Sequence, residues 1–522
     1  MDKSQSPTGA DVLVRTLLAS GVDTCFANPG TSEMHLVAAI DRAPGMRAIL
    51  GLFEGVVTGA ADGYARMAEK PAVTLLHLGP GLANGLANLH NARKAGTPVI
   101  NVVGDHAVRH LQHDAPLASD IDTLARPMSH WVGRAQTPDE VSVCTAQAIA
   151  ATQGTPGCIA TLVLPADSAW GHTDVSPSIV QKAEAVAPMD TDIEAAASAL
   201  RQYGSRALLL LGGKALRAEA IQAAFAVADA VGCRVAAPGS NARMERGGGL
   251  PEIPRIPYAV DSALAFLADV DCIVLMGAPT PVAFFAYPDK PSVLIPVSCR
   301  VVKAVASGVD PQAAMAALAS ICVPQGHKLQ DAVREKAPAP SGPLTPDSIA
   351  QALAHTLPEN AIVVDESVTS GRSIYAMMSG SGPFTLLGNM GGSIGFGMPV
   401  ALGAAIACPD RRVLAMVGDG SAFYTEQALW SLARESANVT VVIFANHNYA
   451  ILQGEWRNTG AGPTGQAARD MLTLDRPRAD WVSLARGHGV EAERVADAAA
   501  FTQALQRAHA TPGPRLIEVA MA

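Results

Sequence analysis

The sequence predicts an α/β protein made of three doubly wound, parallel-sheet domains. Its 522 residues exceed what one hydrophobic core usually holds and suggest about three domains. Short runs rich in β-forming residues alternate with Ala-rich helical patterns along the chain, which is typical of parallel α/β sheets. Two stretches, 172–192 and 333–348, lose this periodicity and gather Pro, Ser and charge. We interpret them as linkers between domains at 1–173, 190–332 and 345–522.

The expected strands are apolar runs that end in Gly, Pro or Asn. In the first domain they are "DTCFANPG" (23–30), "AVTLLHLGPG" (72–81) and "PVINVVGDH" (98–106). In the central domain they are "RALLLLGGKAL" (206–216), "CRVAAPGS" (233–240) and "DCIVLMGAP" (271–279). In the last domain they are "AIVVDES" (361–367), "RVLAMVGDG" (412–420) and "NVTVVIFANHN" (438–448). Ligands of open α/β sheets bind at the carboxyl ends of strands, so the residues that follow these runs are the candidates for a site.

Composition and charge narrow the class of protein. Hydrophobic residues make up 49% and charged residues 16%, which predicts large buried surfaces and subunit contacts. The net charge of −9 comes without acidic or basic blocks, so nucleic acid and anionic membranes are not expected partners. The eight cysteines form no CxxC, and this predicts reduced thiols without a disulfide framework. With neither a signal-peptide core nor an apolar run of about 18 residues, a cytoplasmic location is expected.

Glu54 stands out in "GLFEGVVTGAADGYARM" because apolar and small residues surround it. Burying an unpaired carboxylate is costly, so such a group is protonated, is paired with a donor, or takes part in a reaction. The sequence around Glu54 leaves these three interpretations open.

The segment "MVGDGSAFYTEQALWSLARESANVTVVIFANHNY" predicts a phosphate and metal site. Gly418 and Gly420 flank Asp419 after a strand, and Ser421 opens a helix expected to run to about Arg434. A helix N-terminus beside glycines favours phosphate, and Asp419 supplies an oxygen ligand for a hard cation. Asn446 and Asn448 follow the next strand, which completes a candidate Mg²⁺ site with Asp419. The alternative is an ordinary strand-to-helix turn.

The spacing from this GDG to Asn446 resembles the thiamine diphosphate motif, and "NMGGSIGFGMPVALGAAIA" (389–407) resembles the loop that holds the cofactor's two rings. The chain is similar over nearly its whole length to the thiamine diphosphate enzymes that include acetolactate synthase, pyruvate oxidase and benzoylformate decarboxylase. The resemblance is strongest to benzoylformate decarboxylase and to chains named as acetolactate synthase large subunits. It implies a first domain that binds the pyrimidine, a central Rossmann-like domain, and a third domain that binds the diphosphate.

The resemblance assigns roles around the cofactor. Glu54, before "ADGYAR", would hydrogen-bond the pyrimidine N1′ and promote formation of the C2 ylid. Ile394 would support the bent cofactor, and Gly392 would offer its carbonyl to the 4′-amino group. Further cofactor contacts would come from the following residues: Thr369, Gly418, Gly420, Ser421 and Tyr449, with Tyr424 as a second choice.

The resemblance also places residues near the substrate. His77 would handle protons on the bound intermediate, and Thr31 stands where the decarboxylase has a serine that touches the substrate carboxylate. Gln112 and His113, with His106 and His110 in the same segment, would line the substrate entrance or an interface rather than a metal site. Phe284 stands near the position of a second histidine of the decarboxylase, which predicts a more apolar pocket.

The resulting prediction is a thiamine diphosphate- and Mg²⁺-dependent, nonoxidative 2-oxo acid decarboxylase that works through the C2 ylid and an enamine, with possible carboligation. The central segment lacks the Arg/Asp-rich stretch of acetolactate synthases, so FAD is not expected. Two alternatives stay open: acetolactate synthase-type ligation of two 2-oxo acids, and a catalytically silent paralogue. The family's shared active sites imply a homodimer or homotetramer with the sites at the subunit interface.

Overall fold

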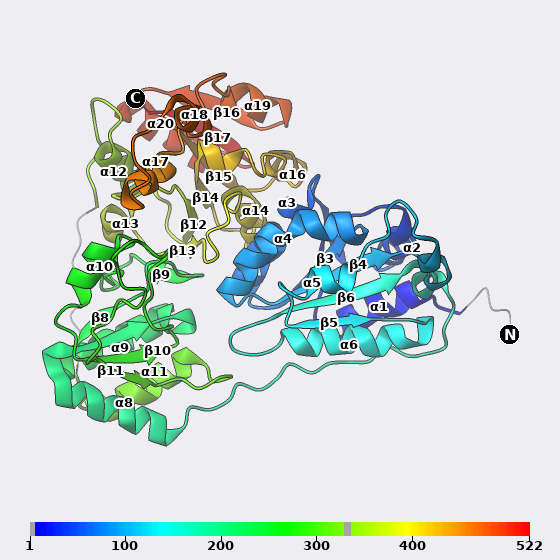
Figure 1. Ribbon diagram of the computed structural model, residues 1–522, viewed down its shortest axis with the longest axis horizontal. Helices are drawn as coiled ribbons and strands as arrows, with labels where there is room; N and C mark the ends of the chain where they lie inside the picture. The colour runs from blue at the N-terminus through cyan, green and yellow to red at the C-terminus, as the bar shows by residue number, and fades with distance from the viewer. Residues whose placement is uncertain (1–5, 328–335, 522) are drawn as a thin grey trace.

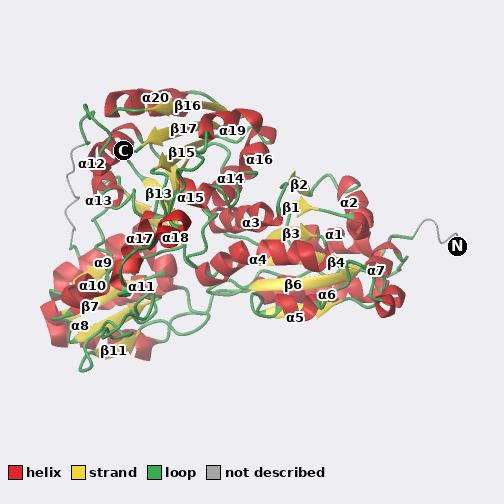
Figure 2. Ribbon diagram, turned by 45° about the horizontal axis from the view of Figure 1, so that its top comes forward, coloured by secondary structure: helices red, strands yellow, loops and turns green. Residues whose placement is uncertain are grey.

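The computed structural model describes residues 6–327 and 336–521 and contains three β-sheets, each flanked by helices (Figure 1). The first and last sheets lie in separate lobes, and the middle sheet lies beside the last one (Figure 2). Residues 333–335 of the expected second linker lie outside the described residues. None of the described helices combines the length and apolarity that crossing a membrane requires.

The first sheet is entirely parallel, in the order β2-β1-β3-β4-β6-β5. Its strands are β1 (Thr24–Asn28), β2 (Arg47–Leu50), β3 (Ala72–Leu76), β4 (Val99–Asp105), β5 (Trp131–Arg134) and β6 (Ile159–Pro165). The helices around it are α1 (Gly9–Ala19), α2 (Met34–Asp41), α3 (Glu54–Ala68), α4 (Leu78–Ala95), α5 (Ile121–Ala125), α6 (Val141–Thr152) and α7 (Ala166–Trp170). Every residue of β3 and β4 is buried, as expected for strands covered on both faces.

The middle sheet is also parallel, in the order β11-β10-β7-β8. Its strands are β7 (Ala207–Leu211), β8 (Arg234–Ala236), β10 (Cys272–Met276) and β11 (Arg300–Lys303). Its helices are α8 (Asp190–Tyr203), α9 (Ala218–Val231), α10 (Val260–Leu267) and α11 (Pro311–Cys322).

The last sheet has the order β16-β17-β15-β14-β12-β13-β9. Its strands are β12 (Ala361–Glu366), β13 (Phe384–Gly388), β14 (Val413–Gly418), β15 (Val439–Ala445), β16 (Glu491–Val495), β17 (Arg515–Ala520) and β9 (Met244–Arg246). Its helices are α12 (Pro346–Thr356), α13 (Ile374–Met377), α14 (Gly397–Ala407), α15 (Asp419–Ala422), α16 (Ala428–Arg434), α17 (Ala450–Asn458), α18 (Gln466–Met471), α19 (Trp481–Gly487) and α20 (Ala498–Ala510). The three sheets confirm the predicted α/β class.

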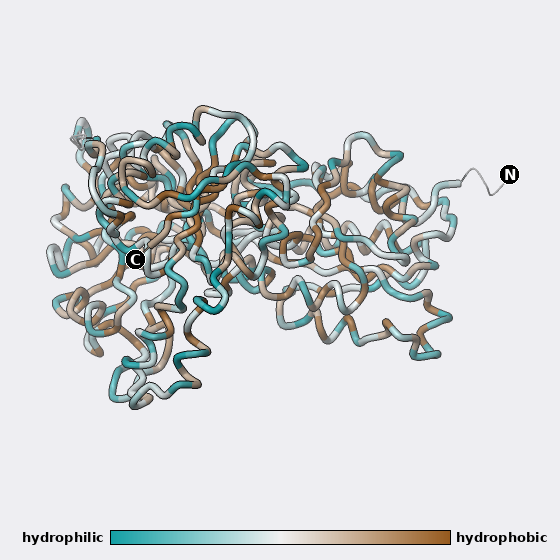
Figure 3. Tube along the Cα trace, turned by 90° about the horizontal axis from the view of Figure 1, so that it is seen from above, coloured by the Kyte–Doolittle hydropathy of each residue, from teal (hydrophilic) through white to brown (hydrophobic). Residues whose placement is uncertain are grey.

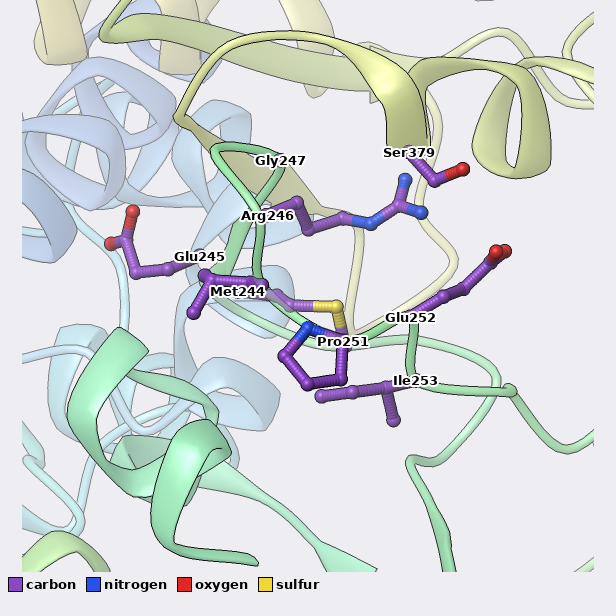
Figure 4. Close-up of a pocket in the computed structure, with 9 residues that line it drawn as sticks. Met244, Glu245, Arg246, Gly247, Pro251, Glu252, Ile253 and Ser379 are labelled. Carbon is purple, nitrogen blue, oxygen red and sulfur yellow. The ribbon is translucent and has the colours of Figure 1, made fainter. Parts of the chain in front are cut away.

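Two features differ from the sequence expectation. The first is β9, which leaves the central segment and pairs antiparallel with β13 of the last sheet. A small pocket lies beside this junction, lined by Met244 to Gly247, Leu250 to Ile253 and Ser379 (Figure 4). None of the predicted site residues lines it.

The second difference concerns the helix expected from Ser421 to about Arg434. The prediction of one continuous helix is wrong. This segment forms two pieces, α15 and α16, separated by 423–427. In this break Thr425 Oγ1 donates to the Gly395 carbonyl at 3.1 Å, so the break is packed against the loop 389–397. A Cβ on Gly395 would lie 2.6 Å from Tyr424 Cβ, which shows how closely the two segments approach.

Helices α3 and α14 join the first and last sheets. A Cβ on Gly63 would lie 2.1 Å from the Val400 carbonyl oxygen, and one on Gly403 would lie 1.9 Å from that of Ala60, so only glycine permits this approach. One hydrophobic cluster runs from Val103 of the first sheet through these helices to Val417 of the last. The hydropathy trace agrees, with apolar segments concentrated inside the lobes (Figure 3).

Candidate functional site

Glu54 is the first residue of α3, and its side chain is buried. Asn84 of α4 donates to Glu54 Oε2 at 3.0 Å. Among the described residues, no donor bonds the other carboxylate oxygen, Oε1. Glu54 is therefore paired with an amide rather than with a cation, and one of its oxygens can still bind a ligand.

The arginine of the "ADGYAR" motif serves a different carboxylate. Arg66 forms an ion pair with Asp62 at 2.6 Å, and both side chains are almost fully buried. The Arg66 Nη1 group also donates to the carbonyls of Ala242 and Gly388, at 3.1 and 2.8 Å. This arginine thus ties α3 to the segment before β9 and to the end of β13, and it leaves Glu54 uncompensated.

The loop 389–397 is held by asparagines of α4. Asn88 donates to the carbonyls of Gly55 and Gly395, at 2.8 and 3.1 Å, which brings the start of α3 beside the loop. Asn91 bonds the Ser393 backbone twice, donating to its carbonyl at 2.9 Å and accepting from its N–H at 3.1 Å. Among the described residues no donor bonds the carbonyls of Gly392 or Ile394. These two carbonyls therefore remain available to a ligand.

Asp419 directly follows β14 as the first residue of α15, and its carboxylate bonds the turn that follows β15. Its Oδ1 accepts from the Gly420 N–H at 2.9 Å, and its Oδ2 accepts from the His447 N–H at 2.7 Å. Burial raises the pKa of Asp419, and the backbone N–H groups of His447 and Gly420 partly offset that rise. A divalent cation beside the carboxylate would favour its charged form, so this environment suits a metal ligand.

Asn446 and Asn448 form the turn opposite Asp419. The Asn446 Oδ1 accepts from the Asn448 N–H at 2.9 Å, and the Asn448 amide donates to the Asn446 carbonyl at 2.7 Å. Gln453 of α17 donates to Asn448 Oδ1 at 3.2 Å. All three predicted metal ligands thus lie at the carboxyl ends of the neighbouring strands β14 and β15, where a cation would be bound by oxygen atoms.

The other predicted cofactor contacts surround this point. Ser421 is buried in α15, and the Tyr449 ring lies so close to Gly420 that a Cβ there would sit 2.5 Å from Tyr449 Cε1. Gly418 is the last residue of β14. Thr369 is half-buried after β12, and Tyr424 is exposed in the break between α15 and α16.

His77, which precedes α4, contacts a carboxylate that sequence reasoning missed. Its Nδ1 lies 2.7 Å from Oε2 of Glu33, and Glu33 is buried. Ser32 donates to the second oxygen of Glu33 at 2.6 Å, and its Oγ lies 3.4 Å from His77 Nδ1. Because a carboxylate only accepts, Nδ1 carries the proton and Nε2 is left free to exchange one. Thr31, the residue predicted to touch substrate, is exposed at the start of the same turn.

The remaining predicted substrate residues lie on two surface segments. Gln112 and His113 are exposed on a 3₁₀ turn (Val108–His113), and the amide of Gln112 donates to its own turn at Arg109. The ring of His110 lies between those of His106 and His113, in tilted contacts with centroid distances of 5.3 and 5.5 Å. This structure does not bring Gln112 into a hydrogen bond with His77 or Thr31.

Phe284 lies against the loop 389–397. A Cβ on Gly392 would lie 2.6 Å from Phe284 Cζ, so the ring lies directly against the loop, and the backbone φ of +76° at this position favours glycine. Phe284 also packs against Phe285 and Tyr258, at centroid distances of 4.8 and 5.7 Å. Tyr287 of the same segment donates to Glu455 of α17 at 2.8 Å. The central segment therefore presents an aromatic wall beside the loop.

One pattern in the sequence could have located the asparagines of α4, which the sequence analysis did not predict. Asn84, Asn88 and Asn91 follow an i, i+4, i+7 spacing, which places three amides on one face of α4. Glu33 follows Thr31 and Ser32 directly, but nothing in its own neighbourhood predicted a contact with His77, 44 positions away.

The chain matches two family models and known proteins along its length. The thiamine pyrophosphate enzyme N-terminal TPP binding domain matches residues 7–125, and the C-terminal TPP binding domain matches residues 371–519. A Mycobacterium tuberculosis protein named, provisionally, as the acetolactate synthase large subunit IlvX is 47% identical, with 98% of each chain covered. The benzoylformate decarboxylase of Pseudomonas aeruginosa is 29% identical, with 96% of each chain covered.

A solved structure shares the fold. The thiamine diphosphate-dependent 4-hydroxybenzoylformate decarboxylase of Rhodococcus jostii superposes with a TM-score of 0.85, at 25% identity and with 99% of each chain covered. The predicted resemblance is thereby confirmed: this chain belongs to the thiamine pyrophosphate enzyme family, among its decarboxylases and acetolactate synthases.

Proposed function

We propose that the protein is a thiamine diphosphate- and Mg²⁺-dependent decarboxylase that releases CO₂ from a 2-oxo acid without oxidation. The observation that carries this proposal is the buried carboxylate of Glu54, which is held by an amide, has one free oxygen, and begins a helix beside the loop 389–397. When bound, the cofactor would supply a nucleophilic carbon and an electron sink for the loss of CO₂.

The oxygen ligands at the ends of β14 and β15 fit a hard cation. Asp419, Asn446 and Asn448 would hold Mg²⁺ together with the cofactor's diphosphate. Asp419→Ala should then weaken the affinity for Mg²⁺ and thiamine diphosphate at least tenfold, as measured by calorimetry. Unchanged cofactor affinity would remove Asp419 from the metal site.

The loop 389–397 would position the organic part of the cofactor. No donor within residues 6–327 and 336–521 bonds the Gly392 carbonyl, which would accept a hydrogen bond from an amino group, while the half-buried Ile394 side chain would support the rings. Glu54 would hold a proton at its free Oε1 and exchange it with the pyrimidine.

His77 would exchange protons with the reacting substrate. Glu33 fixes one ring nitrogen, so the free Nε2 of His77 is the atom that would do so. Thr31, in the same turn, would donate its hydroxyl to the substrate carboxylate. The aromatic wall formed by Tyr258, Phe284 and Phe285 favours an apolar substituent on the 2-oxo acid.

A second candidate is acetolactate synthase-type ligation of two 2-oxo acids, which the name of the 47% identical relative favours. Analysis of products by NMR separates the two, after incubation with thiamine diphosphate, Mg²⁺ and a panel of pyruvate, branched and aryl 2-oxo acids. Aldehyde with CO₂ from a bulky acid would support the decarboxylase. Acetolactate from pyruvate would support the synthase, and cofactor binding without any product would favour a silent paralogue.

We also propose that the active sites are completed at the interface of a homodimer or homotetramer. Large apolar side chains are exposed near both halves of the site: Met34 and Leu52 in the first region, and Phe423 and Tyr424 after Asp419. A second copy would remove them from water. Light scattering at micromolar concentration with cofactor should give at least a dimer, and a monomer would contradict the proposal.

A further inference from the structure

A buried carboxylate outside the residues assigned above reaches the loop 389–397. Glu366 is the last residue of β12, at the carboxyl edge of the last sheet, and pairs in register with Val417 of β14. Its side chain is 4% exposed, and no cation lies among its hydrogen-bond partners in the described structure.

Three successive backbone N–H groups donate to Glu366. Gly395 and Phe396 donate to Oε1 at 2.8 and 3.0 Å, and Gly397 donates to Oε2 at 2.7 Å. Gly397 is the first residue of α14 and Phe396 is its N-cap, so the carboxylate of a different strand accepts from N–H groups at and just before the N-terminus of a helix. Burial raises the pKa of Glu366 to about 7, and the three N–H groups oppose that rise.

The loop is shaped to receive this carboxylate. A Cβ on Gly397 would lie 3.0 Å from Glu366 Oε2 and 2.8 Å from Val417 Cγ2, so the backbone can approach only because residue 397 has no side chain. Asn88 and Thr425 fix the Gly395 carbonyl from the opposite side. The peptide unit between Gly395 and Phe396 is therefore held at both its donor and its acceptor.

We infer that Glu366 is a positioning residue that sets the backbone of the loop 389–397, and through it the direction of the Gly392 carbonyl and the Ile394 side chain toward the cofactor's rings. This inference rests on the proposed function of that loop. In the described structure the side-chain hydrogen bonds of Glu366 go to the loop and none goes to Asp419, Asn446 or Asn448, so its effect should fall on the ring part of the cofactor rather than on Mg²⁺ and diphosphate.

The test compares Glu366→Gln with the matched control Asp365→Asn, which changes the neighbouring carboxylate that bonds Ser367 instead of the loop. A glutamine turns an N–H₂ group toward backbone donors and loses at least one of the three bonds. Calorimetry with two probes, Mg²⁺-thiamine diphosphate and Mg²⁺-pyrophosphate, gives the readout. We expect Glu366→Gln to bind thiamine diphosphate at least tenfold more weakly and pyrophosphate within twofold of the wild type, with Asp365→Asn unchanged for both.

Gly397→Ala supplies a second test. It keeps the carboxylate of Glu366, but its added methyl group pushes that carboxylate away from the loop. If Glu366→Gln does not fold, this variant tests the inference in its place. It should bind thiamine diphosphate more weakly and pyrophosphate as the wild type does, and its amide hydrogens over 389–397 should exchange faster. Equal losses for both probes, or no loss for either, in a folded variant would overturn the inference. A wild-type protein that binds pyrophosphate but not thiamine diphosphate would instead overturn the proposed function.

Discussion

Glu54 is the residue on which the proposed chemistry depends most directly. Glu54→Gln keeps the shape of the side chain and its contact with Asn84 but removes the exchangeable carboxyl proton. We expect cofactor affinity to stay within a fewfold of the wild type and turnover to fall by about 100-fold or more, the range of general acid–base catalysis. Calorimetry and product formation measure the two quantities. The control is Glu69→Gln, at the other end of the same helix, and equal activity of the two variants would remove Glu54 from its role.

Glu33 gives a second prediction at the same scale. The Gly30 N–H and His77 Nδ1 bond the same oxygen of Glu33, Oε2. In Glu33→Gln, either the amide oxygen takes this place and keeps both bonds without the negative charge, or the N–H₂ group takes it and faces both donors. We expect kcat to fall about tenfold and its pH profile to shift, with KM changed less, because the His77 ring loses either the carboxylate charge beside it or the acceptor that fixes its tautomer.

Steady-state kinetics across pH measure this effect. Ser32→Ala serves as the control, since it removes a hydroxyl from Glu33 Oε1 but keeps the bond from Glu33 to His77. If Glu33→Gln retained the wild-type profile, Glu33 would not orient His77.

Helices and strands differ in how far the sequence predicts them. All nine strands expected from apolar runs are present and lie inside the quoted segments, because buried parallel strands are continuously apolar. Strand β9 was missed because "MER" carries no pattern and forms a strand only through its partner β13. The break between α15 and α16 was missed for a related reason, since a loop 30 residues earlier in the chain causes it.

The same limit applies to the site. The strand ends located Asp419 and Asn446, and the resemblance located Glu54 and His77. The groups that hold them, such as Asn84 and Glu33, act across 30 and 44 positions, and such contacts exist only in the folded chain.

Packing of α20 on the last sheet predicts a pH dependence of stability. Burial, and next the charge of Arg412, lower the pKa of His509 to about 4 from its ordinary 6.5. Between about pH 4 and pH 6.5 the unfolded chain binds a proton at His509 and the folded chain does not. The free energy of unfolding is therefore highest above pH 6.5 and decreases as the pH falls through this range. The loss between pH 7 and pH 5 should be up to about 2 kcal/mol.

The measurement compares urea unfolding of the wild type and His509→Gln at pH 7 and pH 5. The variant should lose less stability on acidification than the wild type, while His488→Gln, at the end of α19, should follow the wild type. Identical pH dependence in all three proteins would mean that His509 titrates normally in the folded state.

At the scale of the whole molecule, Arg66 holds the regions of the chain together. It pairs with Asp62 on α3, donates to backbone carbonyls before β9 and at the end of β13, and lies 5.1 Å from the centre of the Phe396 ring. The site needs this docking because α3 begins at Glu54 and β13 leads into the loop 389–397.

Arg66→Met should therefore destabilise the protein far more than loss of a surface ion pair. The variant leaves the buried Asp62 carboxylate unpaired, which costs about 3 to 5 kcal/mol. Arg42→Met is the control, since Arg42 pairs with Asp11 at the surface and should contribute below about 1 kcal/mol. The double variant Asp62→Leu/Arg66→Met should recover part of the loss, because no buried charge remains. Urea unfolding measures all three, and an Arg66→Met variant no less stable than Arg42→Met would show that the three regions are held together without this ion pair.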